Sequence, residues 1–136
     1  MITAVDTNVL LDVFGADHSF GPRSADAIRA CMREGSLIAC DVVWAEVAAS
    51  FRSADAVEDA MERLGVGFSS LAMSSALAAG AAWARYRRRG GRRDRVIADF
   101  LIGAHATAVA DRLLTRDRGF YRSYFGSLSL IDPSER

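Results

Sequence analysis

Short runs of apolar residues alternate along the chain with segments in which apolar residues recur every three or four positions. The runs predict strands and the spaced segments predict helices, so strands and helices should alternate. The run at residues 2–5 is typical of a short buried strand, and residues 7–14 directly after it have the pattern of a helix. The same alternation recurs to the end of the chain. We expect further strands at residues 37–40, 66–68, 112–114 and 128–131, and further helices at residues 23–33, 42–51, 54–64, 74–88, 96–110 and 119–124.

This order of elements predicts an α/β fold, in which helices cover both faces of a parallel sheet. With 136 residues and no repeat, linker or low-complexity stretch, residues 1–136 are expected to form a single domain. Pro22 is well placed to begin a helix, and Asp41 is expected to cap the helix that follows the second strand. Open sheets of this kind bind their ligands at the carboxyl ends of the strands.

One acid interrupts the most apolar helix of the chain. Asp99 is the only formally charged side chain between residues 96 and 110, a run that is apolar nearly all the way round a helix. A carboxylate there is costly unless a cation, a metal ion or several hydrogen bonds meet it. An ion pair with Arg95, one turn earlier, is the alternative, although the guanidinium would also have to be desolvated.

Three more acids lie at the ends or flanks of predicted core elements: Asp6 ends the first strand, Glu46 lies within an apolar helix, and Asp117 follows the fourth strand. Each has a simple alternative, as a helix cap, an exposed helix residue or a turn acid. If they converged with Asp99, their mutual repulsion would reach several kcal/mol at intermediate dielectric. A divalent ion would relieve it, and oxygen ligands favour Mg²⁺ or Mn²⁺ over zinc. Such a site suits phosphodiester hydrolysis, and Asn8 could support it.

The composition is that of an ordinary soluble protein, with 51% hydrophobic and 25% charged residues. No apolar run is long enough to span a membrane, and the N-terminus lacks the pattern of a signal peptide, so we expect a cytoplasmic protein. Cys31 and Cys40 have no metal-binding spacing and are expected to be buried thiols rather than a disulfide or a zinc site.

The formal net charge is zero, but all 17 basic residues are arginine and seven of them lie between residues 85 and 95. This run is either a compositional bias on a solvated helix end or a contact for a nucleic acid backbone. On the second interpretation, we expect RNA contacts from Arg87, Arg88, Arg92 and Arg116. The absence of lysine argues against a phosphoacceptor receiver domain, a haloacid-dehalogenase-type phosphatase and a Walker-type nucleotidase.

Four segments together have a familiar order and spacing. They are VDTNVLLD at 5–12, VVWAEVAASF at 42–51, ADFLIGAHA at 98–106 and LLTRDRGFYRSYFGSLSLI at 113–131. Over essentially its whole length the chain resembles PIN-domain ribonucleases of the VapC type, the toxins of bacterial and archaeal toxin–antitoxin pairs. The resemblance implies a flavodoxin-like (PIN-like) three-layer α/β/α sandwich and an endoribonuclease that depends on Mg²⁺ or Mn²⁺.

The resemblance also implies roles and partners. The acidic quartet of the family falls on Asp6, Glu46, Asp99 and Asp117, with Asp6 and Asp99 as the closest metal ligands. Its supporting polar residues fall on Asn8 and Thr115. The implied partners are an RNA substrate, a second copy of the chain and a VapB-type antitoxin, in a heterotetramer or a larger assembly. A PIN-like module that binds RNA or protein without cutting is the alternative.

Overall fold

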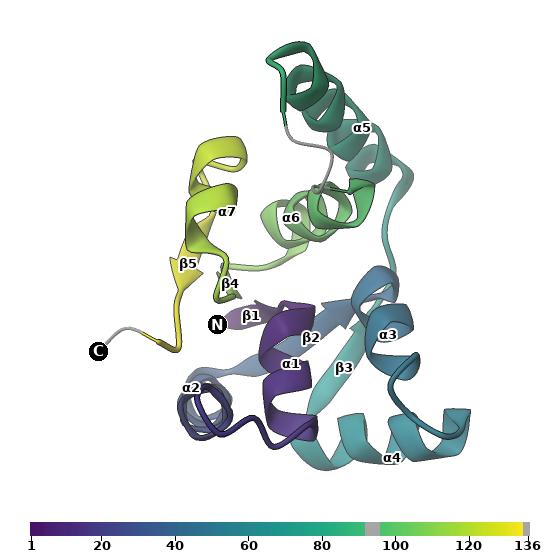
Figure 1. Cartoon of the computed structure of the whole chain (residues 1–136), viewed down its shortest axis with the longest axis vertical. Coiled ribbons are helices and arrows are strands. Elements are labelled where there is room, and N and C mark those ends of the chain that lie inside the picture. Colours follow the sequence, from purple (N-terminus) through teal and green to yellow (C-terminus); the bar gives the residue numbers. More distant parts are fainter. Residues whose placement is uncertain (92–95, 135–136) are drawn as a thin grey trace.

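The computed structural model describes residues 1–91 and 96–134. Its centre is a five-stranded sheet with the strand order β3-β2-β1-β4-β5 (Figure 1). The strands are β1 (Ile2–Val5), β2 (Ser36–Cys40), β3 (Val66–Ser69), β4 (Arg112–Leu114) and β5 (Ser129–Ile131). All neighbouring strands are parallel, which confirms the predicted sheet and places every carboxyl end along one edge.

Helices cover both faces of the sheet. Those in the described part of the chain are α1 (Thr7–Phe14), α2 (Gly21–Glu34), α3 (Asp41–Ala48), α4 (Ala54–Leu64), α5 (Met73–Arg88), α6 (Ile97–Val109) and α7 (Arg118–Tyr124). Helix α6 contacts β1 and β4 and carries α5 on its outer side, whereas α1 packs against α2 and α3. In Figure 1, α5 and α6 lie on one side of the sheet and α1, α2 and α4 on the other, as expected for a three-layer sandwich.

The apolar helix that carries Asp99 is buried, as its sequence predicts. Residues 100 and 102–106 of α6 are all buried, and Phe100 has no exposed surface. Asp99 itself lies in the first turn of the helix and is only partly buried. Because the positive end of the helix dipole lies there, the carboxylate is less costly than it would be in the middle of the helix.

Helix α3 is shorter than its apolar spacing predicts. It ends at Ala48, three residues before Phe51. The Phe51 ring instead meets the Phe14 ring edge-on, with centroids 5.3 Å apart. The Ser53 side chain then accepts a hydrogen bond from the Ala56 amide and begins α4. A capping serine shortly after Phe51 therefore ends a pattern that spacing alone would have continued.

The expected cap of α3 is also wrong. The cap position is occupied by Cys40, with no side-chain hydrogen bond, and Asp41 is already the first residue of the helix. Its Oδ1 atom is buried without a hydrogen-bond partner among the described residues. Asp41 can therefore favour the start of α3 through its charge in the first turn, and not as a cap. Pro22 does lie in the first turn of α2, as predicted.

The order of the strands changes direction at one place, where sheets of this kind are expected to form a crevice. The chain runs from β1 to β2 and β3 in one direction, and returns to the other side of β1 with β4. Sheets of this type open between the two strands where the direction changes, here β1 and β4. Asp6 directly follows β1, and its amide donates to the Leu114 carbonyl oxygen at the end of β4, 2.9 Å away. Asp6 and the loop after β4 therefore meet at this crevice.

Candidate functional site

Asp6 is the most constrained carboxylate of the candidate site. Only 5% of its surface is exposed. Its Oδ1 accepts from the Thr7 amide at 2.7 Å, and its Oδ2 accepts from the Thr115 hydroxyl at 2.7 Å and from the Asn8 amide group at 3.4 Å. Both supporting residues expected from the sequence thus contact the same carboxylate. Three donors fix its orientation at the carboxyl end of β1.

These donors do not offset the burial of the Asp6 carboxylate. Burial raises the pKa of Asp6 from 3.8 to about 6, although hydrogen bonds from Thr115 and Thr7 and the nearby Tyr121 hydroxyl act in the opposite direction. The negative charge of Asp99 raises this pKa further. The Asp6 charge is therefore incompletely compensated by the protein, and a cation close to it would be favourable.

Glu46 is linked to the same region through α1. The Thr7 hydroxyl donates to Glu46 Oε1 at 2.8 Å, and Thr7 adjoins Asp6 in the chain. Glu46 is exposed on α3, so its carboxylate faces the outer side of the site. Thr7 therefore contacts both Glu46 and Asp6, and the two carboxylates are linked through it without a direct hydrogen bond.

Asp99 and Asp117 reach the site from the two other sides. Asp99 comes from the first turn of α6 and interacts electrostatically with Asp6. Asp117 precedes α7, and its amide donates to the Thr115 hydroxyl at 3.0 Å. Thr115 therefore links the loop of Asp117 to the Asp6 carboxylate. The alternative partner of Asp99, Arg95, lies outside the described residues.

Tyr121 is a polar residue of the site that the sequence patterns did not indicate. It is fully buried, and its hydroxyl makes no hydrogen bond of good geometry within the described part of the chain. Burial, followed by the negative charges of Asp6, Asp99 and Asp117, raises its pKa well above the usual value. The spacing of four residues from Asp117, one turn of α7, is the signal that could have indicated it.

The rings near Tyr121 support the protein interior. Phe120 and Tyr121 are buried and their centroids lie 5.0 Å apart, while Phe120 also meets Phe100 of α6 at 5.0 Å. The burial of these two rings indicates that they pack inside the protein and do not form a surface on which RNA bases could stack.

Asp6, Asp99 and Asp117 all act electrostatically on Tyr121, but the four acids do not form a ready-made coordination sphere. Within residues 1–91 and 96–134, no three side chains of His, Cys, Asp or Glu converge closely enough to hold a metal ion. The available donors are oxygen atoms, which suit Mg²⁺ and Mn²⁺. Binding would require at least one side chain to turn, for example Glu46 away from Thr7. The assignment of these acids as metal ligands stays a prediction.

Arg116, expected to contact RNA, forms an ion pair inside the protein. Its Nε and Nη2 donate to Oδ2 and Oδ1 of Asp12 at 2.7 and 3.0 Å. Asp12 is 5% exposed, and the analysis of the sequence did not single it out. Its partner lies 104 residues away, so no local pattern could indicate the pair. RNA binding by Arg116 stays untested, and its contacts here are structural.

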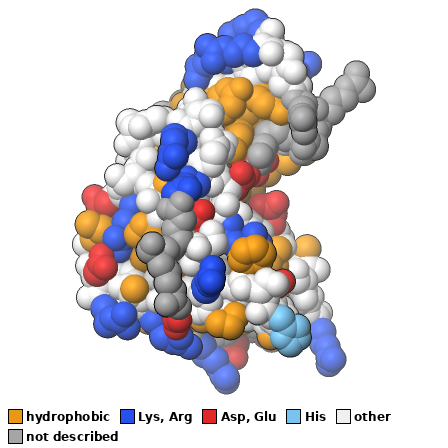
Figure 2. All heavy atoms as spheres, turned by 60° about the vertical axis from the view of Figure 1, so that its left-hand side comes forward, with side chains coloured by type: hydrophobic (Ala, Val, Ile, Leu, Met, Phe, Trp, Pro, Cys, Tyr) orange, Lys and Arg blue, Asp and Glu red, His pale blue; other side chains and the backbone are white. Residues whose placement is uncertain are grey.

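The other candidate RNA contacts lie far from the acids. Arg87 and Arg88 are exposed near the end of α5, where arginine side chains gather at the top of the molecule (Figure 2). The Arg87 guanidinium lies 5.2 Å from the Trp83 ring centroid. Arg92 lies outside the described residues. Figure 2 also shows acidic side chains beside the notch below the end of α5.

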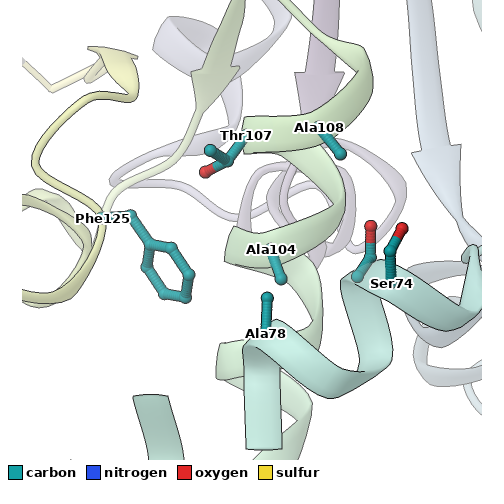
Figure 3. A pocket seen from close by; sticks show the side chains of 7 residues that line it. Ser74, Ala78, Ala104, Thr107, Ala108 and Phe125 are labelled. Carbon is teal, nitrogen blue, oxygen red and sulfur yellow. The ribbon is translucent and has the colours of Figure 1, made fainter. Parts of the chain in front are cut away.

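A hollow of about 290 Å³ lies between α5, α6 and the segment after α7 (Figure 3). Small side chains line most of it, including Ala78 and Ala104, and the Phe125 ring closes one side. It contains no titratable side chain and is distinct from the acidic crevice. Among the described helices, none has the length and apolarity needed to cross a membrane.

Comparison with known proteins agrees with this fold. The PIN domain family matches residues 3–126, whereas no curated protein sequence matches the chain. A VapBC2 structure from Rickettsia felis, bound to a promoter DNA fragment, is similar with a TM-score of 0.74 at 15% identity, covering 97% of this chain and 98% of that one. VapBC-1 from nontypeable Haemophilus influenzae gives 0.73 at 17% identity, covering 99% and 100%.

A third similar structure is a toxin–antitoxin complex from Klebsiella pneumoniae, with a TM-score of 0.70 at 18% identity, covering 98% of this chain and 99% of that one. At these identities the likeness concerns the fold. The family match is independent of it and spans the strand of Asp6, the helices of Glu46 and Asp99, and the loop of Asp117. The chain therefore belongs to the PIN domain family.

Proposed function

We propose that this protein is an endoribonuclease toxin of the VapC type, which hydrolyses RNA phosphodiester bonds with Mg²⁺ or Mn²⁺ at Asp6, Glu46, Asp99 and Asp117. The observation that carries the proposal is the buried Asp6 carboxylate, whose pKa is about 6 because its charge is under-compensated. It lies at the switch point of the sheet, beside a second acid from α6. A divalent cation is the ligand that such a site would bind most favourably.

The residues of the site would have two roles, as direct ligands of the ion and as groups that orient water or another side chain. Asp6 and Asp99 would hold the ion, while Glu46 and Asp117 would orient water on the outer side of the site. When bound, the ion would polarise the phosphate oxygens and lower the pKa of a water molecule. Thr115 keeps Asp6 oriented through its hydroxyl. The hydrolysis would leave a 5′-phosphate and a 3′-hydroxyl.

The assembly follows from the same likeness. The similar structures include VapBC complexes and a complex described as toxin and antitoxin. We propose that this chain is likewise held by a VapB-type antitoxin and forms a homodimer within the complex. RNA and antitoxin would both meet the protein in the cytoplasm.

The test is cleavage of a structured RNA by the purified protein with Mg²⁺ or Mn²⁺. We expect cleavage to stop with EDTA, to return with excess Mn²⁺ and to be absent in Asp6→Asn. The matched control is Asp26→Asn, since this exposed acid pairs only on the surface, with Arg29 at 2.9 Å. Cleavage by wild-type protein that resists both EDTA and Asp6→Asn would contradict the proposal.

A module that binds without cutting is the second candidate. The observation in its favour is that no three possible ligands converge in the described residues. This function predicts RNA or protein binding that is indifferent to Mn²⁺ and to Asp6→Asn. Calorimetric titration of the apo protein with Mn²⁺ separates the two, because only the nuclease should bind the ion and lose this binding in Asp6→Asn.

A further inference from the structure

The loop after β4 is anchored by one buried ion pair. Arg116 donates from Nε and Nη2 to the two oxygens of Asp12, in the fork geometry that only arginine offers. The Ser24 hydroxyl donates to Asp12 Oδ2 at 3.0 Å. Asp12 on α1 is thus held by residues from α2 and from the loop after β4.

The guanidinium of Arg116 is also covered on one face. Its central carbon lies 4.0 Å from the centroid of the Phe20 ring, and 28% of the side chain is exposed. The hydrogen bonds and charge of Asp12 raise the pKa of Arg116, with a smaller contribution from Asp17. A phosphate that drew this guanidinium away from Asp12 would leave a buried carboxylate unpaired, which is costly.

The residues on both sides of Arg116 belong to the acidic site. Thr115 donates to Asp6, Asp117 donates from its amide to Thr115, and the Arg116 amide donates to Asn8 Oδ1 at 3.2 Å. The backbone of residues 115–117 therefore approaches Asp6 and Asn8 directly. The ion pair with Asp12 fixes this segment from the opposite end of α1.

We infer that Asp12 and Arg116 are positioning residues of the nuclease: their bidentate pair holds residues 115–117 so that Thr115 and Asp117 face Asp6. This inference rests on the proposed function. Arg116 then positions residues 115–117 inside the protein and does not contact RNA, although its charge suggested such a contact.

The first experiment separates turnover from RNA binding. In Asp12→Asn and in Arg116→Gln we expect kcat with Mn²⁺ to fall about tenfold or more, since small displacements of catalytic groups have effects of this size. KM for RNA and the salt dependence of RNA binding should stay unchanged. The control variants are Asp26→Asn and Arg29→Gln, which remove an exposed ion pair of the same chemistry and should leave kcat unchanged.

The two variants also distinguish positioning from RNA contact. Asp12→Asn leaves the charge of Arg116 in place and frees it for RNA. If Arg116 bound phosphate, Arg116→Gln would raise KM for RNA. It would also lower the slope of log RNA affinity against log salt concentration (the salt slope) by about 0.7, the value for one contact to a single strand. Asp12→Asn would then keep the kcat of wild type. That combination would overturn the inference. Arg116→Lys, which keeps the charge but not the fork, should retain only part of kcat.

A second measurement does not depend on catalysis. Hydrogen exchange of the Asp117 amide, which donates to the Thr115 hydroxyl, should be faster in Asp12→Asn than in wild type. Ser24→Ala removes one hydroxyl and no charge, so it should give a smaller increase and keeps the test available if Asp12→Asn does not fold. Unchanged exchange in both variants refutes the positioning role. Wild-type protein without nuclease activity but with this exchange pattern would refute only the proposed function.

Discussion

At the scale of single residues, Asp6 makes the apo protein sensitive to pH. Its pKa is about 6 in the folded state against 3.8 for an ordinary aspartate. The folded state therefore binds the proton more tightly, and stability is lost as the pH rises through the interval between these values. One pKa unit corresponds to about 1.36 kcal/mol, so the complete loss approaches about 3 kcal/mol.

We therefore expect Asp6→Asn to stabilise the apo protein at neutral and higher pH while it abolishes cleavage. Between about pH 4 and pH 8, wild type should lose about 2 kcal/mol that the variant keeps, because most of the Asp6 titration lies in this interval. Urea unfolding in EDTA at both pH values measures the difference. Asp26→Asn, an exposed control, should follow wild type, and a variant whose stability changes with pH as wild type does would show that Asp6 is compensated in another way.

Sequence patterns indicated some residues of the candidate site and missed others. The acids Asp6 and Asp99 were recognisable because each ends or interrupts an apolar run. Asn8 was recognisable as a support for the site from its position two residues after Asp6, and Thr115 was assigned from the family resemblance. Asp12 was not recognisable, since it looks like an ordinary helix residue until its partner 104 residues away is known. Tyr121 lies one turn of α7 after Asp117, but this local spacing does not reveal its electrostatic interaction with Asp6.

At the scale of elements, two glycines in neighbouring helices test how tightly α6 is held. A Cβ at Gly103 would lie 2.4 Å from the Phe125 ring, whereas a Cβ at Gly80 on α5 would meet nothing within 4 Å. We expect Gly103→Ala to destabilise the protein by about 1–3 kcal/mol through overpacking. Gly80→Ala should stabilise it by about 0.5–1 kcal/mol, as alanine does in an exposed helix.

Chemical denaturation of both glycine variants gives the comparison directly. Because α6 carries Asp99 and Phe125 follows α7, Gly103→Ala should also lower nuclease activity, and Gly80→Ala should not. Equal stabilisation by both substitutions would mean that the Phe125 ring moves aside without cost.

The elements themselves were largely predictable. Every strand and helix of the described chain was expected near its observed position, because each combines an apolar period with a clear boundary residue. Two predictions for α3 were wrong. Asp41 was expected to cap the helix, because an acid in the first turn looks like a cap in the sequence. The helix was expected to reach Phe51, because the apolar spacing continues until a serine cap begins the next helix. The parallel topology predicted that the carboxyl ends of the strands lie along one edge, whereas the side-chain distances between the acids depend on packing that the sequence does not encode locally.

At the scale of the whole molecule, exposed arginines gather at the end of α5. Arg85 and residues 87–89 are exposed, and none of the four forms an ion pair with a described residue. If they guide RNA, replacing Arg87 and Arg88 by glutamine should reduce the salt slope of RNA binding by about 1.4, or about 0.7 for each charge. Turnover at saturating RNA should stay unchanged.

The control for this arginine pair is Arg29→Gln with Arg63→Gln, because both of these exposed residues already pair with nearby acids, Asp26 and Asp59. RNA binding measured at several salt concentrations gives the two slopes. Equal slopes in both double variants would identify the end of α5 as a solvated surface with no part in binding.

The hydrogen bond between Thr115 and Asp6 has a consequence for the cell that makes this protein. It joins residues 109 positions apart, and the loop of Asp117 comes from the last fifth of the chain. A polypeptide that ends before this loop has Asp6 but lacks Thr115 and Asp117. If the protein is the nuclease proposed above, its site would therefore be complete only when synthesis of the chain is almost finished.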